Sequence, residues 1–186
     1  MVVSNLPRKR LYDWISRLSA NLAAAIALRA RDDTFLVPGL GKEIVGQLLQ
    51  TPQVVHPAVN VCAGATLDGG ADRRALSDCN YGLHDPPNDE RISPLSAASH
   101  AGLPRAFIQV FGMDPLRDEG LLYACLLRDA GVLNIYPGVP HMSVMVFIET
   151  EVAAHVERDV RDGLRWLLSS ASLRGSSCDD FSYVTF

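Results

Sequence analysis

The chain has 186 residues, 48% of them hydrophobic and 20% charged, which is typical of one globular domain with a substantial core. Its formal net charge of −4 argues against a nucleic-acid-binding surface, and the basic cluster at residues 8–10 is expected to be a solvated terminus. No apolar run approaches the ~20 residues that a membrane span needs, and the N-terminus has no secretory leader pattern.

The N-terminal half predicts one long helix and one short strand. Residues 18–31 are rich in good helix formers, and either Ser16 or Ser19 could cap the start of this helix. Residues 44–49 form an apolar run of strand length. Residues 57–105 are punctuated by Gly and Pro and predict loops, with room for a short helix at 71–79.

The C-terminal half alternates strands with helices. Residues 107–111 and 132–136 are apolar runs of strand length, and they flank a predicted helix at 121–130 that Gly131 would end as a C-terminal cap. Residues 151–168 carry apolar side chains at spacings of three to four, which is typical of an amphipathic helix. This alternation predicts an α/β fold, with a mostly parallel sheet flanked by helices.

Three strands are few for such a sheet, so we expect a single, partial domain across the whole chain. The Ser-rich residues 169–186 are expected to form a flexible tail. The four cysteines are scattered without a Cys-x-x-Cys pair, which fits reduced thiols in a cytoplasmic setting. Cys125 lies within a predicted helix and is expected to be a buried thiol.

An acid and a histidine follow the last two predicted strands. Asp114 comes directly after the strand at 107–111 and just before a helix, and His141 follows the strand at 132–136, twenty-seven residues later. The α/β-hydrolases place the acid and the base of their catalytic triad in this order. Without that ordering, Asp114 would be a helix N-cap followed by Pro115, and His141 an ordinary loop histidine.

Several motifs carry a resemblance to a known family. They are Ser-Pro-Leu at residues 93–95, His-Ala-Gly-Leu-Pro at 100–104, Gln-Val-Phe-Gly-Met-Asp-Pro-Leu-Arg-Asp-Glu-Gly at 109–120 and Tyr-Pro-Gly-Val-Pro-His at 136–141. In this order they resemble the C-terminal half of α/β-hydrolases related to hormone-sensitive lipase, and most of all the fungal esterase-like group. The resemblance covers about residues 12–168. It implies an α/β-hydrolase fold that is incomplete at its N-terminal side, with Asp114 as triad acid and His141 as triad base.

The nucleophile of such an enzyme is a serine in Gly-x-Ser-x-Gly, because a tight turn between strand and helix admits only small neighbours. This pattern is absent from the sequence, and so is the His-Gly-Gly of the oxyanion loop. Aligned on Asn21, the family's serine falls on Arg17 or, with one inserted residue, on Ser16. The glycine positions hold Trp14 and Leu18 around Ser16, and Arg17 and Asn21 around the other nearby serine, Ser19. Both serines could instead belong to a helix cap or a solvated turn. Truncation of the family's front half would explain these absences.

Three hypotheses follow. The first is a carboxylic-ester hydrolase with Ser16 or Ser19 as nucleophile, and the second is a catalytically inactive, truncated remnant of such a hydrolase. The third is a metal site formed by His56, Cys62, Cys79 and His84, whose spacing matches no usual zinc pattern. The resemblance implies a small uncharged ester as substrate, no cofactor, and a possible place in fungal secondary metabolism.

Overall fold

The computed structural model describes residues 17–32, 44–56, 59, 86–127, 131–141, 143–169 and 181–183. The helices and strands of these residues follow in chain order: α2 (Arg17–Asp32), β1 (Gln47–Gln50), the 3₁₀ turn η1 (Pro94–Ser96), β2 (Ala106–Met113), α4 (Arg117–Leu126), β3 (Gly131–Pro140), α5 (Ser143–Val146), α6 (Glu151–Leu168) and β4 (Phe181–Tyr183). The short helix predicted at 71–79 lies outside the described residues.

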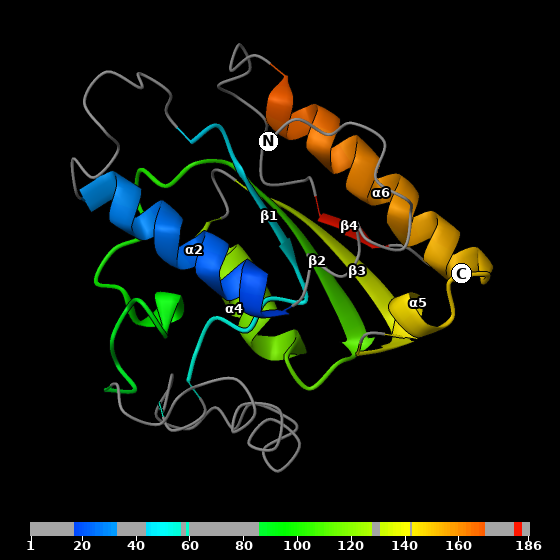
Figure 1. Ribbon diagram of the computed structural model, residues 1–186, viewed down its shortest axis with the longest axis horizontal. Helices are drawn as coiled ribbons and strands as arrows, with labels where there is room; N and C mark the ends of the chain where they lie inside the picture. The colour runs from blue at the N-terminus through cyan, green and yellow to red at the C-terminus, as the bar shows by residue number, and fades with distance from the viewer. Residues whose placement is uncertain are drawn as a thin grey trace.

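The four strands form one parallel sheet in the order β1-β2-β3-β4 (Figure 1). The register joins Gln50 to Gln109 and Gln109 to Asn134, so the same level of the sheet is polar on three adjacent strands. The prediction of a parallel sheet flanked by helices is confirmed.

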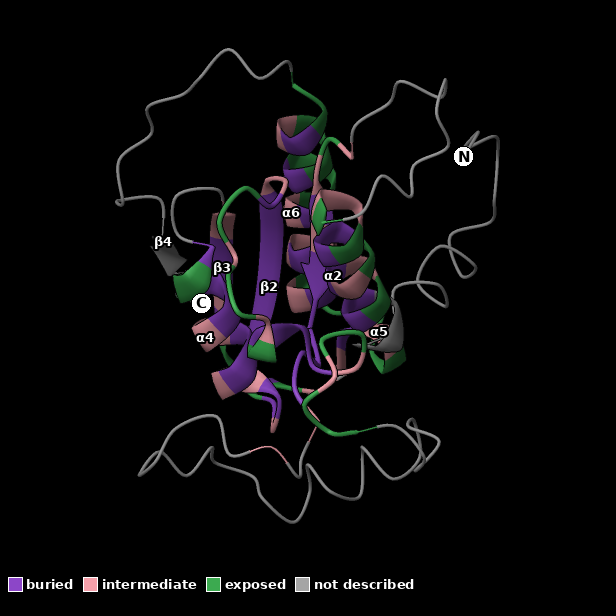
Figure 2. Cartoon of the chain, turned by 90° about the vertical axis from the view of Figure 1, so that its left-hand side faces the viewer, coloured by how far each residue is buried: buried purple, intermediate pink, exposed green. Residues whose placement is uncertain are grey.

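Alternate residues of β2 face two different helical layers. Ala106, Ile108 and Val110 belong to a core with the helices α2 and α4, whereas Phe111 packs with α6 on the other face. Successive side chains of a strand point to opposite faces of its sheet. Because both faces are covered, β2 has a continuous buried run rather than an alternating pattern (Figure 2).

Helix α2 packs on the sheet through its small residues. Ala24, Ala27 and Leu28 are buried against the core, whereas Leu22 and Ile26 are 57% and 47% exposed. Small side chains allow the helix to lie close to the sheet, and the larger residues then fall on the outer face.

Helix α6 begins and ends where the amphipathic pattern predicted. Its close contact with the sheet depends on Gly163, since a Cβ atom there would lie 2.5–2.6 Å from three ring atoms of Phe107. At the start of α6, Thr150 accepts a hydrogen bond from the Ala153 N–H, as an N-cap residue does.

Three predictions of local structure need correction. Gly131 does not cap a helix but is the first residue of β3. The helix before it, α4, runs from Arg117 to Leu126, so it both starts and ends earlier than predicted. Cys125 is exposed, because α4 turns Tyr123 and Ala124 toward the sheet and Cys125 away from it. Phe181–Tyr183 form β4 beside β3, where a flexible tail was expected.

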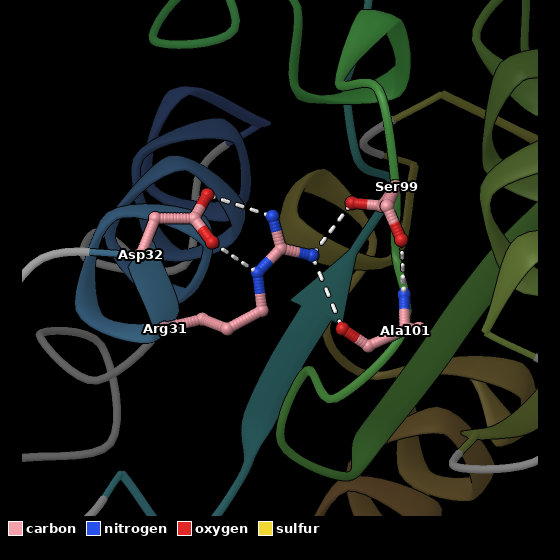
Figure 3. Close-up of polar contacts among 4 residues, drawn as sticks. All are labelled: Arg31, Asp32, Ser99 and Ala101. Atoms are coloured by element: carbon pink, nitrogen blue, oxygen red, sulfur yellow. Dashed lines mark hydrogen bonds and ion pairs between the residues drawn. The ribbon is translucent and has the colours of Figure 1, made fainter.

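Arg31, near the end of α2, forms hydrogen bonds with the segment before β2. Its Nη1 donates to the carbonyl oxygens of Ser99 and Ala101 at 2.6 and 3.2 Å, while its Nε and Nη2 pair with the Asp32 carboxylate (Figure 3). One guanidinium therefore joins two segments that are far apart in the sequence.

His100 makes the stability of this segment depend on pH. Its Nε2 donates to the carbonyl of Pro94 at 3.0 Å, and its ring packs edge-on against Tyr123. Burial is the main cause that lowers the pKa of His100, so the unfolded chain binds a proton more readily than the folded one. We expect the free energy of unfolding to fall as the pH drops below about 6.5, with no such change above it.

Urea unfolding at about pH 7.5 and about pH 5.5 measures this effect. The replacement His100→Gln keeps a donor but does not titrate, so its loss between the two pH values should be smaller. An equal loss in both proteins would contradict the prediction.

Candidate functional site

Asp114 lies in a turn between β2 and α4. Its Oδ1 accepts the backbone N–H of Leu116 at 2.8 Å, and its carbonyl oxygen accepts the N–H of Arg117 at 3.0 Å. The helix proper begins at Arg117, and its N-cap residue Leu116 provides no side-chain cap. Asp114 therefore fixes the turn that precedes the helix, rather than serving as the N-cap with Pro115 in the first helical position.

The other carboxylate oxygen of Asp114 binds His141. His141 follows β3 directly, and its Nδ1 lies 2.6 Å from Asp114 Oδ2. The two side chains are 15% and 1% exposed. An ionised carboxylate only accepts hydrogen bonds, so Nδ1 carries a proton and, in the neutral ring, Nε2 is an acceptor.

The Nε2 atom of His141 is buried and has no hydrogen-bond partner among the residues that the structure describes. A buried polar nitrogen without a partner is unusual, because it loses its bonds to water without a replacement. Nε2 is the atom that would accept the hydroxyl proton of a nucleophile in a hydrolase. The geometry thus provides a carboxylate, an imidazole held by it, and an acceptor atom that no described residue uses.

A close contact of main chains brings Asp114 and His141 together. A Cβ atom on Gly112 would lie 2.9 Å from the Cα of Pro137 and 3.0 Å from the backbone N of Gly138. Beyond this point the register shifts, from Phe111 opposite Tyr136 to Met113 opposite Pro140. This irregularity takes up the two extra residues of β3, so both strands end at the same level, and Asp114 and His141, the next residue of each, lie side by side.

Large apolar side chains are exposed at the end of β2 and at and just after the end of α5. Met113 at the end of β2 is 65% exposed, and Val146, Phe147 and Ile148 at the end of α5 are 59–70% exposed. Such a group of large exposed apolar side chains is typical of a surface that contacts a ligand or another protein.

The described residues place neither candidate serine at this site. Ser16 lies outside the described residues. Ser19 belongs to the first turn of α2, and its side chain is outside the described part of the structure. Asp114 and His141 are therefore the two predicted site residues that lie together.

Two buried polar features escaped the sequence analysis. The first is Glu119, 1% exposed, whose Oε2 accepts the N–H groups of Val54 and Val55, both at 2.8 Å. Asn21 of α2 donates to the carbonyl of the adjacent Gln53 at 2.7 Å. The segment after β1 is thus held between α2 and α4. Glu119 stands within the recognised Asp-Pro-Leu-Arg-Asp-Glu-Gly motif, but nothing in that pattern indicates its partners.

The second feature is a chain of hydrogen bonds across the sheet. Gln50 donates to Gln109 at 2.9 Å, Gln109 donates to the Tyr136 hydroxyl at 2.6 Å, and that hydroxyl donates to Asp159 of α6 at 2.6 Å. Burial, followed by the bond to Asp159, raises the pKa of Tyr136 well above its usual value, so the phenol stays protonated. The strand pattern shows where these polar residues lie, but not that they form one chain.

The metal hypothesis finds no support within the ranges that the structure describes. They contain no group of three or more His, Cys, Asp or Glu side chains that could hold an ion. Of the four proposed ligands, only His56 is described. In the same ranges, no helix combines the length and the apolar character that crossing a membrane requires.

Comparison with known sequences gives the family. A family model described as alpha/beta hydrolase fold matches residues 19–145. An AB hydrolase superfamily protein of Schizosaccharomyces pombe is 27% identical over 176 residues, which are 88% of this chain and 50% of that protein. A versiconal hemiacetal acetate esterase of Emericella nidulans is 32% identical over 144 residues, 66% of this chain and 46% of that enzyme.

Solved structures agree with these sequences. Vibralactone cyclase aligns with a TM-score of 0.70 and 33% identity, over 84% of this chain and 48% of that structure. The carboxylesterase EstE1, cloned from a metagenomic library, aligns with a TM-score of 0.63 and 25% identity, over 81% of this chain and 52% of its own. The chain thus spans about half the length of these proteins, and it belongs to the α/β-hydrolase fold family, with esterases related to hormone-sensitive lipase among its relatives.

Proposed function

We propose that the chain takes part in carboxylic-ester hydrolysis, with Asp114 as the acid and His141 as the base of a serine-dependent mechanism. The observation that carries this proposal is the 2.6 Å bond between His141 Nδ1 and Asp114 Oδ2, together with the buried, unpaired Nε2. An esterase needs this combination, because the imidazole must be oriented on one side and available as a base on the other.

Each proton has a defined place in the proposed reaction. His141 Nε2 takes the serine hydroxyl proton as the serine oxygen attacks the ester carbonyl. The imidazolium then gives that proton to the leaving alcohol as the C–O bond breaks, which leaves an acyl-serine. Water, deprotonated by the same nitrogen, hydrolyses the acyl group. Asp114 stays ionised throughout and stabilises the imidazolium.

The serine of this mechanism would be Ser16 or Ser19. Alignment with the family puts the nucleophile at Arg17 or, with one inserted residue, at Ser16, and neither serine has the glycine neighbours of a nucleophile elbow. This absence favours a second candidate function, in which the protein is a catalytically inactive, truncated relative of the esterases that keeps their acid–base geometry.

The substrate class follows from the relatives. By similarity to the versiconal hemiacetal acetate esterases we infer a small, uncharged ester and a role in fungal secondary metabolism. The exposed apolar residues Met113 and Phe147 near the site suit an uncharged substrate. The scattered cysteines suit the reducing environment of the cytoplasm.

Covalent labelling separates the two candidate functions. The purified chain is treated with a fluorophosphonate probe and assayed with p-nitrophenyl acetate. Labelling that is lost in Ser16→Ala or in Ser19→Ala would identify a nucleophile in this chain. Labelling and hydrolysis that both require His141 support the esterase, whichever serine reacts. If neither reaction occurs, the second candidate is correct.

A further inference from the structure

A cleft of about 330 Å³ lies between α6 and the sheet. Residues near the amino ends of two strands line it, with Phe107 as the second residue of β2 and Val132 as the second residue of β3. Asp114 and His141 instead follow the last residues of the same two strands. The cleft is therefore a feature separate from the acid–histidine pair.

One end of the cleft is aromatic. Phe107 and Trp166 both line it, and the helix backbone lies directly on the Phe107 ring, since a Cβ atom on Gly163 would be 2.5–2.6 Å from three ring atoms. The guanidinium carbon of Arg105 lies 3.8 Å from the centroid of the Trp166 ring. This cation–π contact holds the indole in place and puts a positive charge beside it. The aromatic end thus offers apolar contact and repels a second cation.

The other end of the cleft is polar and is formed by Asn134 and Asp159. Both side chains lie beside the hydroxyl of Tyr136, which donates to Asp159 Oδ2 at 2.6 Å and lies 3.5 Å from Asn134 Nδ2. The Nε2 atom of His155 is 3.4 Å from the same oxygen of Asp159. These contacts use Oδ2 of Asp159 and Nδ2 of Asn134, so the Oδ1 atom of each side chain takes no part in them.

Two acceptor oxygens are left over at the polar end. Asn134 is 8% exposed, and its Oδ1 receives no hydrogen bond from a residue that the structure describes. The same holds for Asp159 Oδ1 among the described residues. A buried amide oxygen normally has a donor, so one without a donor in the wall of a cleft marks a place where a ligand or a water molecule binds.

The charges around the cleft favour a cation as its ligand. Asp159 and Asp162 both line it, and a carboxylate can only accept hydrogen bonds. Asp162 pairs at the rim with Arg165, whose side chain is 75% exposed, so solvent screens that pair. Asp159 is the more enclosed carboxylate, with 19% of its side chain exposed. An anion would be repelled here, and a ligand without donor groups would leave the Asn134 oxygen unsatisfied.

We propose that this cleft binds a small primary amine in its ammonium form. The ammonium group lies between Asp159 Oδ1 and Asn134 Oδ1. An apolar group of the amine, aryl or alkyl, packs against Phe107 and Trp166. A primary ammonium has three N–H donors and stays protonated at neutral pH, because the pKa of such an amine is about 10. Charge-assisted hydrogen bonds to Asp159 supply affinity, and the positive charge of Arg105 at the aromatic end sets the direction in which the amine lies.

Titration of the full chain with 2-phenylethylamine tests the proposal. Solution NMR follows the indole N–H of Trp166 and the side-chain amide of Asn134, and both signals should shift as the site fills, with a Kd of about 1 mM or lower. 2-Phenylethanol has the same shape without the charge, and the N-trimethylated amine keeps the charge without an N–H. Each should bind at least about tenfold more weakly than the primary amine. No saturable binding of the amine, or equal binding of either analogue, would overturn the proposal.

Two variants of α6 test the role of the carboxylate. Asp159→Asn keeps an oxygen that accepts the Tyr136 hydroxyl but removes the negative charge, and should weaken binding of 2-phenylethylamine by at least about tenfold. Glu157→Gln removes one negative charge from a side chain of the same helix that pairs with Arg161. This matched control should bind the amine as the unaltered chain does. Similar affinities in the two variants would refute the assignment of Asp159.

Val132→Phe tests the cleft without changing its charges. The added ring would occupy space in the cleft, so the Trp166 N–H should no longer respond to the amine. A cooperative urea transition in this variant and in Asp159→Asn shows that both are folded. Unchanged binding by Val132→Phe would place the amine elsewhere on the protein and would overturn the proposal. These measurements do not use ester hydrolysis, so amine binding and the proposed function can fail independently of each other.

Discussion

Replacing His141 by alanine is expected to lower the rate of hydrolysis of p-nitrophenyl acetate by ~10⁴-fold or more. The alanine variant has no group that can take the proton of the nucleophile and return it to the leaving alcohol. The measurement is kcat/KM for the ester, with fluorophosphonate labelling in parallel.

His155→Ala is the matched control. His155 lies on α6, where it contacts Asp159 and the ring of Tyr136. It is not part of the pair formed by Asp114 and His141. We expect this variant to retain its activity. Similar losses in His141→Ala and His155→Ala would show that general loss of structure, rather than loss of the base, explains the effect.

Asp114→Asn should lower the rate by a similar factor, ~10⁴. Both carboxylate oxygens of Asp114 accept hydrogen bonds, one from Leu116 N–H and one from His141 Nδ1. An asparagine amide has one acceptor oxygen, so its NH₂ group must face one of these two donors. The imidazole would then change its tautomer or the turn would open. Activity close to that of the unaltered protein would contradict the assigned role of Asp114.

Replacing Glu119 by alanine is expected to destabilise the fold by about 3–5 kcal/mol, since two buried N–H groups would lose a charged acceptor. These are the groups of Val54 and Val55, which the Glu119 Oε2 binds. An effect of this size is a large part of the total stability of a small domain. The free energy of unfolding, from urea denaturation, measures it.

Two control variants show the cause of that loss. Glu119→Gln can keep its oxygen between the two N–H groups, so it should lose clearly less stability than Glu119→Ala. Glu157→Ala removes a partly exposed glutamate that pairs with Arg161 on α6, and should cost at most about 1 kcal/mol. Equal losses in Glu119→Ala and Glu157→Ala would contradict the structural role of Glu119.

Periodicity and motif order predicted the parts of the fold that depend on local sequence. Helix α6 has the bounds that its apolar spacing indicated, and the strands containing Phe107 and Leu133 lie where apolar runs stand in the sequence. The order of Asp114 and His141 after two strands was enough to expect them near each other. In a parallel sheet, adjacent strands end at the same side.

Contacts between distant segments were not predictable in this way. The composition of α2 indicated a helix but not which face is buried: Ala24 and Ala27 lie in the core, whereas Leu22 is exposed. The partners of Glu119 lie 64 and 65 residues away in the sequence, so no local pattern indicates them. The strand β4 has only three residues, and its pairing with β3 depends on tertiary position rather than on propensity.

The contact at Gly112 also bears on how this site changes during evolution. The separation of Asp114 and His141 depends on main-chain atoms of Pro137 and Gly138 that lie against a residue with no side chain. The same contact packs the ends of β2 and β3 against each other, so it also contributes to the stability of the fold. Selection for folding alone would therefore preserve the acid–histidine pair in a lineage that had lost its nucleophile. Substitutions at Gly112 should be rare in active and inactive descendants alike, whereas the residues around the serine would diverge only in the inactive ones.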